Sequence, residues 1–466
     1  MANTNGKKLD RIKSNIFSRT VSLAKFSLNA GAGLAGQGLT KIFKSEEAGE
    51  IQWNQFIAAQ AENFSKEIGE LKGSIMKAGQ MLSMYGEHFF PPEVNKYFKT
   101  LQQDSPALKW EAIEPLIIKY LGAEKYHELD VDHEPLACAS LGQVHRAVIK
   151  KTKESVVLKV QYPKVDKAID SDLRAIRTFI QLLKILPQDT ALDPVFEEIK
   201  EMLLQESDYE QEAKKTMQFY ERVKDDPRFI VPKIYPEFSN KRILTSSFER
   251  GLRLEDDLIQ SLSQERRNQL AQNFLDLYFQ ELFIWKDLQT DPHAGNYKIR
   301  LAADGKDQWV LFDFGATRSY SDSFLNAYHR MIKGSLVNNP QMLRAAAKDL
   351  KFIYDHDDPL LIEKFEEFCI ETVEPFLEAA DPRQKGPVDE QGNYDWKTTD
   401  LPQRLSKRVL EIIKNFKWRT PPREILFLDR KTGGVFIIMS LLKAKMNSRP
   451  TIMKYLNSVH ANSDTV

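Results

Sequence analysis

The feature that most constrains this chain is a pair of short turns between Gln289 and Arg318. The first turn reads QTDPHAGN and ends at Asn296, and a hydrophilic stretch separates it from the second, which reads LFDFGATR. Together they present Asp291, Asn296 and Asp313, two carboxylates and an amide. Oxygen ligands of this kind hold Mg²⁺ on phosphates, and a carboxylate beside an attacking oxygen assists phosphoryl transfer. The two turns therefore predict a hairpin built for phosphate chemistry.

The spacing within the turns matches that of protein kinases. Asn296 lies five residues after Asp291, as in the kinase catalytic loop, and Asp313 opens an Asp-Phe-Gly triplet like the one that binds metal there. We interpret His293 as a brace of the loop through hydrogen bonds rather than as a metal ligand or general base. For Arg318 two interpretations stay open: contact with phosphate or the catalytic carboxylate, or a salt bridge within its own lobe.

A second kinase-like pattern lies upstream. Residues 137–144 match the phosphate loop Gly-x-Gly-x-x-Gly-x-Val position for position, with alanines at the first two glycine positions. Glycine lets a backbone lie close to phosphates, so the alanines predict a stiffer loop. Taken alone, the octet is more typical of an ordinary hairpin of small residues. Its candidate nucleotide-binding residues are Ala137, Ala139, Ser140, Gly142 and Val144.

Lys159 ends a VVLK segment and stands where kinases place the lysine that contacts the α- and β-phosphates. Such a lysine needs a carboxylate to hold it, and the acidic stretch at 205–213 offers several. A lone strand lysine is usually a solvated edge residue, and an acidic run is usually a solvated helix face. Together with the two turns, these patterns occur in the same sequence order as in protein kinases. This order favours a nucleotide site over both of the simpler interpretations.

Composition narrows the class of protein. The chain has 466 residues, so we expect two or three domains. Its 66 Lys and Arg balance 66 Asp and Glu, which argues against a nucleic-acid partner. The two cysteines, Cys138 and Cys369, are far apart in sequence, so we expect neither a disulfide framework nor a cysteine zinc site. A reducing compartment fits this pattern.

The first thirty residues carry six basic side chains and one acidic one, with apolar residues at near-helical spacing. Three interpretations stay open: a solvated tail, an interfacial helix on an anionic membrane, or a transit peptide. No uninterrupted apolar run reaches the ~18 residues of a transmembrane helix. We expect a cytoplasmic chain or one peripheral on a membrane, with mitochondrial targeting left open.

Periodicity divides the chain into four expected segments. These are a basic, glycine-containing segment at 1–45, a helical extension at 46–122, a kinase-like amino-terminal lobe with inserted helices at 123–252, and a mostly helical carboxy-terminal lobe at 253–466.

Within these segments, helical spacing covers 49–86, a segment beginning at 91, and 110–121. An antiparallel sheet of about five strands follows, and after Arg318 the chain looks helical except at 381–401. The expected strands are 134–139, 143–150, 155–161, 230–236 and 242–248, the helices 166–186, 195–223 and 254–285, and the inter-lobe linker 249–252.

Five motifs together resemble the UbiB/AarF-domain family of atypical kinases, over about Leu71 to Arg318. They are Lys77-x-Gly79-Gln80, the alanine-rich loop, Glu206-x-Asp208-Tyr209-x-x-Glu212-Ala213, the turn at 290–296 and Phe312-Asp313-Phe314-Gly315. The resemblance implies a protein-kinase-like α+β fold of two lobes, with the helical extension capping the cleft.

The resemblance also assigns roles. Asp291 would be the catalytic aspartate, with Asn296 and Asp313 as Mg²⁺ ligands, and Lys159 would pair with Glu212. Lys77 would be catalytic together with Asp291 and would fold over the active site towards Glu206 and Asp208. These two acids and Gln80 would be regulatory.

The function implied by the family is that of a kinase-like ATPase, using ATP and Mg²⁺ and supporting isoprenoid quinone (ubiquinone) biosynthesis. Implied partners are a lipid or quinone-precursor ligand, a membrane surface and other proteins of that pathway. A small-molecule or lipid kinase, and a non-catalytic nucleotide-responsive lipid-binding scaffold, are the alternatives.

Two departures from known patterns are visible. We expect this chain to lack the pair of carboxy-terminal membrane spans found in some bacterial family members, since the apolar stretch from Gly433 ends at Lys443. No Ala-Pro-Glu follows Asp-Phe-Gly, so we expect no long activation loop and no platform for a protein substrate.

Overall fold

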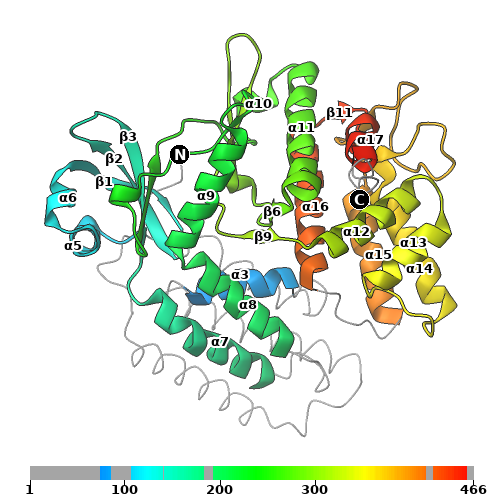
Figure 1. Ribbon diagram of the computed structural model, residues 1–466, viewed down its shortest axis with the longest axis horizontal. Helices are drawn as coiled ribbons and strands as arrows, with labels where there is room; N and C mark the ends of the chain where they lie inside the picture. Colours follow the sequence, from blue (N-terminus) through cyan, green and yellow to red (C-terminus); the bar gives the residue numbers. More distant parts are fainter. Residues whose placement is uncertain (1–73, 86–106, 140, 183–192, 416–422, 459–466) are drawn as a thin grey trace, which may run out of the picture. The chain divides into compact units, whose positions relative to one another are not determined.

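The computed structural model describes residues 74–85, 107–139, 141–182, 193–415 and 423–458 (Figure 1). These residues divide into two compact units. The first holds the described residues up to Met217 together with Lys233–Phe248, and the second holds Gln218–Pro232 and everything from Glu249. The predicted segment at 1–45 and most of the helical extension lie outside the described residues.

A four-stranded antiparallel sheet forms the centre of the first unit, in the order β1-β2-β3-β5. Its strands are β1 (Leu129–Cys138), β2 (Gly142–Ile149), β3 (Ser155–Gln161) and β5 (Ile243–Ser247). Alternate residues of β3, namely Val156, Leu158 and Val160, are fully buried, as period-2 patterning requires. The prediction of about five strands was wrong, because β4 (Phe229–Ile230) pairs in parallel with β8 (Gln308–Leu311) of the second unit.

The helices of the first unit follow the sequence order expected. The helix predicted at 110–121 is confirmed as α5 (Trp110–Leu121), and a short α6 (Ala123–His127) follows it. Helix α3 (Ser74–Tyr85) lies beside α7 (Val165–Leu182) and α8 (Asp193–Glu206).

The segment predicted as helical at 195–223 forms two helices, because α8 ends at Glu206 and a second helix starts shortly after it. The Asp208 carboxylate accepts hydrogen bonds from the backbone N–H groups of Glu210 and Gln211, at 3.1 Å each. A side chain in this position caps a helix start, so α9 (Tyr209–Val223) begins anew at the next residue.

The described part of the second unit combines a helical bundle with three small sheets, two of which flank the predicted turns in sequence. One sheet has the order β4-β8-β7, with β7 at Tyr297–Arg300, and the other pairs β6 (Asp287–Gln289) with β9 (Thr317–Ser319). Helix α10 (Asp257–Gln260) precedes α11 (Gln264–Phe279), and α11 runs into one π-helical segment, η2 (Gln280–Trp285), which ends at Lys286 with φ 55°. The remaining helices are α12 (Asp322–Leu336), α13 (Pro340–Asp349), α14 (Pro359–Thr372), α15 (Leu401–Asn415), α16 (Arg423–Leu441) and α17 (Arg449–Ser458).

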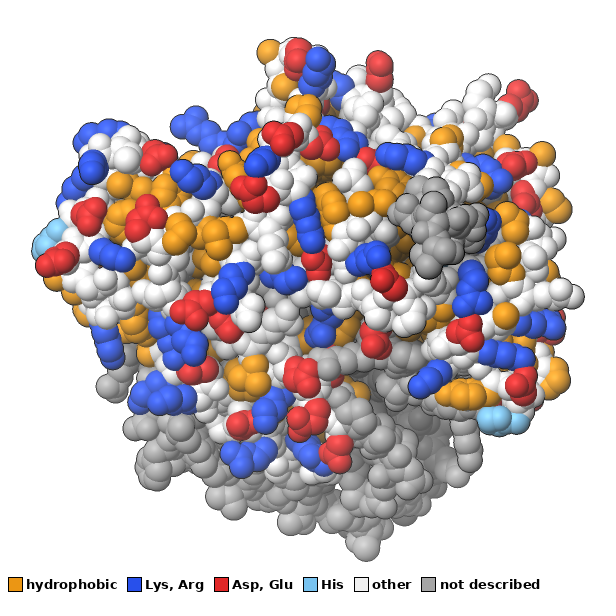
Figure 2. Space-filling model, viewed as in Figure 1, with side chains coloured by type: hydrophobic (Ala, Val, Ile, Leu, Met, Phe, Trp, Pro, Cys, Tyr) orange, Lys and Arg blue, Asp and Glu red, His pale blue; other side chains and the backbone are white. Residues whose placement is uncertain are grey.

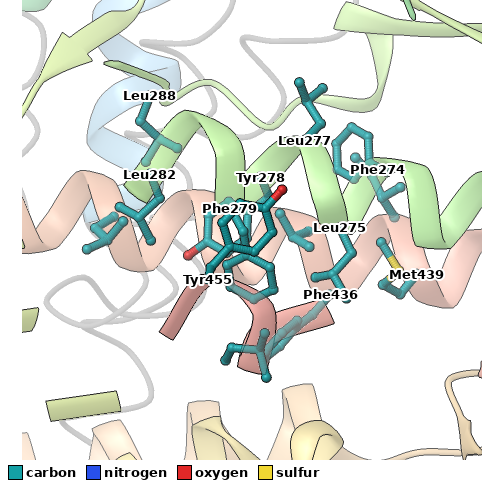
Figure 3. Packing of buried hydrophobic residues seen from close by; sticks show 14 of the residues in the cluster. Phe274, Leu275, Leu277, Tyr278, Phe279, Leu282, Leu288, Phe436, Met439 and Tyr455 are labelled. Atoms are coloured by element: carbon teal, nitrogen blue, oxygen red, sulfur yellow. The ribbon is translucent and has the colours of Figure 1, made fainter. Parts of the chain in front are cut away.

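The core of the second unit lies between α11, α16 and α17 (Figure 3). Phe274 and Phe279 of α11 pack in one cluster with Met439 of α16 and Tyr455 of α17, and each is buried. The polar interruption at 381–401 contains an unpredicted element, β10 (Tyr394–Asp395), which pairs with β11 (Lys445–Met446).

The surface bears charges of both signs. Figure 2 shows acidic and basic side chains interspersed over the visible face, in line with the balanced composition. Cys138 is exposed and Cys369 is buried. Among the helices of the described residues, none combines the length and apolarity that crossing a bilayer would need.

Candidate active site

The ion pair expected between β3 and α9 is present in the first unit. The Lys159 Nζ lies 2.8 Å and 2.9 Å from the two carboxylate oxygens of Glu212. Glu212 is buried in the first turn of α9, and Lys159 is partly buried over the ring of Tyr209. Because Asp208 fixes where α9 begins, it also fixes where Glu212 faces β3. A cation held in this way suits the phosphates of a nucleotide.

The alanine-rich loop connects β1 to β2. Ala139 donates its backbone N–H to the carbonyl of Gly142 at 2.8 Å, and Ala137 pairs with Val144 across the strands. Ser140 lies outside the described residues.

Gly142 is required here for a reason that the sequence did not indicate. A Cβ at this position would lie 2.4 Å from the carbonyl oxygen of Val160 and 2.9 Å from the hydroxyl of Tyr209. The glycine therefore permits close packing of β2 on β3 and α9. Close approach to a phosphate is not needed to explain it.

Lys77 lies on α3 and faces the acidic end of α8. Its Nζ is 2.5 Å from a carboxylate oxygen of Glu206, and both side chains are largely buried. This is one of the two acidic partners named from sequence; the other, Asp208, caps α9. The side chain of Gln80 lies outside the described residues.

The two turns of the second unit are brought together by the β7–β8 hairpin. Tyr297 pairs with Leu311, and the N–H of Phe312 donates to the carbonyl of Asn296 at 2.9 Å. Asn296 and Asp313 thus flank the open end of one hairpin. The Asn296 Nδ2 also donates to the carbonyl of Asp291 at 3.1 Å, which ties the third predicted residue to the same place.

Asp313 has a left-handed backbone, with φ 57°. Aspartate tolerates this region better than most residues, because its carboxylate can accept a nearby backbone N–H. Here one carboxylate oxygen accepts the N–H of Gly315 at 3.2 Å. Phe314 is buried against Phe219, with ring centroids 4.4 Å apart.

The structure agrees with the interpretation of His293 and shows a different contact for Arg318. His293 braces the first turn as expected, since its Nδ1 accepts the N–H of Gly295 at 3.0 Å. The guanidinium of Arg318 stacks on the ring of Phe427, 3.6 Å from the ring centroid. A different arginine contacts the candidate catalytic carboxylate: the Arg430 Nη2 lies 2.6 Å from Asp291 Oδ1.

Sequence reasoning missed the whole contribution of α16. Besides Arg430, this helix contributes Lys431, whose Nζ lies 3.2 Å from the hydroxyl of Tyr297, and Gly434, where a Cβ would fall 2.0 Å from Pro292. The only local signal is the string RKTGG, two cations and two glycines in an otherwise apolar stretch. Such a string suggests close packing and polar contacts but names no partner.

The residues present fit a hard divalent cation bound together with phosphate. No cluster of three or more His, Cys, Asp or Glu side chains suited to a metal occurs within the described ranges. Mg²⁺ often takes only one or two protein ligands and completes its shell with water and phosphate oxygens. Asp313 can offer a carboxylate. Asn296 can offer its amide oxygen, because its Nδ2 is engaged with Asp291.

Comparison with known proteins identifies the family. A model of the ABC1 atypical kinase-like domain matches residues 100–346. This chain belongs to that family. The predicted resemblance to UbiB/AarF-domain kinases and the predicted kinase-like fold are thereby confirmed.

Relatives extend the similarity over most of the chain. The zebrafish "Atypical kinase COQ8B, mitochondrial" is 28% identical over 96% of this chain and 69% of its own length. The "Atypical kinase COQ8, mitochondrial" of Saccharomyces cerevisiae is 27% identical over 94% of this chain and 85% of its own. A solved complex of Rv3197 with erythromycin from Mycobacterium tuberculosis has a TM-score of 0.56 at 23% identity, covering 86% of this chain and 96% of its own, which shows a shared fold.

Proposed function

We propose that this chain binds ATP with Mg²⁺ and cleaves the γ-phosphate bond. One observation supports this most directly: Asp291, Asn296 and Asp313, which were predicted from two separate turns, meet at the end of a single hairpin. Kinase-like chemistry needs a nucleophile-orienting carboxylate and two oxygen ligands for metal at such a point. Membership of the ABC1 family supports the same assignment.

Each residue then has a distinct task. Lys159, oriented by Glu212, would bind the α- and β-phosphates. Asp313 and Asn296 would hold the cation, which when bound neutralises charge that develops on the phosphates. Asp291 would orient the attacking hydroxyl or water and accept its proton.

The chain after the metal turn supports water or a small acceptor over a protein substrate. Only a few residues separate Gly315 from α12, and within them β9 is paired with β6. A protein kinase uses a longer activation segment in this position to present its substrate. Hydrolysis, or transfer to a small molecule, needs no such platform.

The setting that we propose is isoprenoid quinone (ubiquinone) biosynthesis. The relatives named COQ8 support it, and their names also carry the word mitochondrial. A lipid or quinone-precursor ligand, peripheral contact with a membrane and partner proteins of that pathway belong to the same proposal.

The test is turnover of ATP labelled in its γ-phosphate, with Mg²⁺ and with or without anionic liposomes and a quinone-precursor mimic. Wild type should release labelled inorganic phosphate, and Asp291→Asn should lose this activity. Arg330→Met serves as a control, because Arg330 of α12 pairs with the exposed Asp349 of α13. A labelled small acceptor would favour the lipid or small-molecule kinase instead. If wild type cleaves no ATP under any of these conditions, the proposal fails.

A further inference from the structure

A buried polar cluster lies beneath the two turns in the second unit. It consists of Glu281 from η2, Gln289 from β6, Tyr297 from β7 and Lys431 from α16. The side chains of Lys431 and Glu281 are only 2% and 3% exposed, and their charged atoms lie 3.2 Å apart. Burial of an ion pair costs several kcal/mol per charge unless further hydrogen bonds satisfy it. Polar partners inside the cluster supply those bonds.

Gln289 is the centre of this cluster. Its Oε1 accepts from the hydroxyl of Tyr297 at 3.0 Å and faces the ammonium of Lys431 at 3.5 Å. Its backbone N–H donates to Glu281 at 3.3 Å. Its Nε2 donates to two carbonyls, that of Asp291 at 2.9 Å and that of Asp313 at 3.0 Å.

The orientation of the Gln289 amide follows from these partners. A lysine ammonium can only donate, so Lys431 must face the amide oxygen. The amide nitrogen then points at the two carbonyls, and its two hydrogens match two acceptors. Burial lowers the pKa of Lys431, but the Glu281 carboxylate more than offsets this and holds the pKa above its ordinary value. The ammonium therefore stays charged and keeps the amide in one orientation.

A single side-chain amide thus joins the backbone of the candidate catalytic turn to that of the candidate metal turn. We infer that Lys431 is a positioning residue, which acts through Gln289 to fix the spacing of Asp291 and Asp313. This inference rests on the proposed function, since it assigns the two turns to one reaction. The π-helical segment η2 contributes by placing Glu281 in the buried cluster, where its carboxylate favours the charged form of Lys431. Such local irregularities are frequent at functional sites.

Removing this positioning residue should therefore lower turnover and metal affinity, independently of any change in the stability of the fold. Removing a residue that orients metal ligands through hydrogen bonds typically lowers metal affinity or activity by about 10–100-fold. A purely structural ion pair would change the melting temperature and leave the properties of the folded molecules intact.

The central variant is the neutral pair Glu281→Gln with Lys431→Met, which removes both charges together and leaves no unpaired ion in the core. We expect kcat to fall by roughly tenfold or more and the Mg²⁺ concentration at half-maximal turnover to rise several-fold. Calorimetry should show weaker Mg²⁺-dependent ATP binding and unchanged binding of metal-free ATP. All measurements are made well below the melting temperature of each variant.

Two further variants test the route through Gln289. Gln289→Met should reproduce the loss, and combining it with the neutral pair should cause no further decrease, because both remove the same restraint. Tyr297→Phe removes one of the two contacts to the Gln289 oxygen, so its effect should be smaller. This variant keeps the core volume nearly unchanged and serves if the paired variant fails to fold.

The matched control is Glu374→Gln with Arg404→Met, which removes another ion pair of the same unit, at 2.8 Å, between the buried Glu374 and the partly buried Arg404 of α15. It should alter stability alone. Wild-type kcat and Mg²⁺ dependence in the folded neutral-pair or Tyr297→Phe variants, or losses that add with Gln289→Met, would overturn the inference. Failure of wild type to cleave ATP would refute the proposed function instead, and Mg²⁺-dependent ATP binding would still test the positioning role.

Discussion

Replacing Glu212 by glutamine tests the nucleotide site of the first unit in isolation. The change keeps the shape of the side chain but removes the charge that faces Lys159 at 2.8 Å and 2.9 Å. Hydrogen bonds to charged groups contribute about 1.5–3 kcal/mol. Because Glu212 is only 5% exposed, solvent compensates little of this loss.

That energy converts to a loss of roughly 10- to 150-fold in ATP affinity or in kcat/KM, at about 1.4 kcal/mol per tenfold. Calorimetry and steady-state hydrolysis should show it, with circular dichroism to confirm the fold. Glu210→Gln, an exposed position on the same helix, provides the control and should behave as wild type. Equal affinity and turnover in both variants would show that Lys159 does not depend on Glu212, and the assignment of this pair to phosphate binding would be wrong.

Three more predictions concern other parts of the molecule. Asp313→Asn should weaken Mg²⁺-dependent ATP binding by roughly tenfold or more, whereas Asp291→Asn should spare binding and lower kcat; equal loss of binding in both would contradict these roles. Lys77→Ala removes the ammonium that faces Glu206 and should raise self-phosphorylation relative to hydrolysis while ATP still binds, so wild-type ratios in a labelled-ATP assay would refute a lid role. Burial lowers the pKa of His145, so the unfolded chain binds a proton more readily than the folded one. Stability from this group is fully present above about pH 6.5 and is lost as the pH falls below that value. Melting temperatures between pH 7.5 and 5.5 should therefore fall more steeply for wild type than for His145→Asn, and parallel curves would exclude this histidine.

Local sequence predicted those parts of the site that depend on short spacing. Asn296 and Asp313 could be placed together because a single short hairpin connects them. Lys159 and Glu212 required the additional knowledge of motif order, since their contact spans 53 residues. The contact between Arg430 and Asp291 spans 139 residues, and nothing in the neighbourhood of either residue specifies it.

The errors in the fold have physical causes of the same kind. The break after Glu206 depends on a single capping carboxylate, which periodicity does not register when apolar spacing continues on both sides. The two-residue strand β4 has the composition of any edge strand, so its sequence does not tell which sheet it joins. Gly142 was assigned to phosphate approach by analogy, whereas its neighbours in space are a carbonyl oxygen and a tyrosine hydroxyl.

The pairing of β4 with β8 affects the folding of the chain during synthesis and its division by proteolysis. Residues 218–232 belong to the second unit, although the first unit resumes after them with β5. On the ribosome, β4 emerges about 80 residues before β8, so this short segment must stay unpaired until its partner strand has been synthesised. No single cleavage of the backbone would separate the two units intact. A fragment starting at Glu249 would lack a strand of its own sheet, and we expect it to be soluble and folded only when a peptide covering 218–232 is supplied.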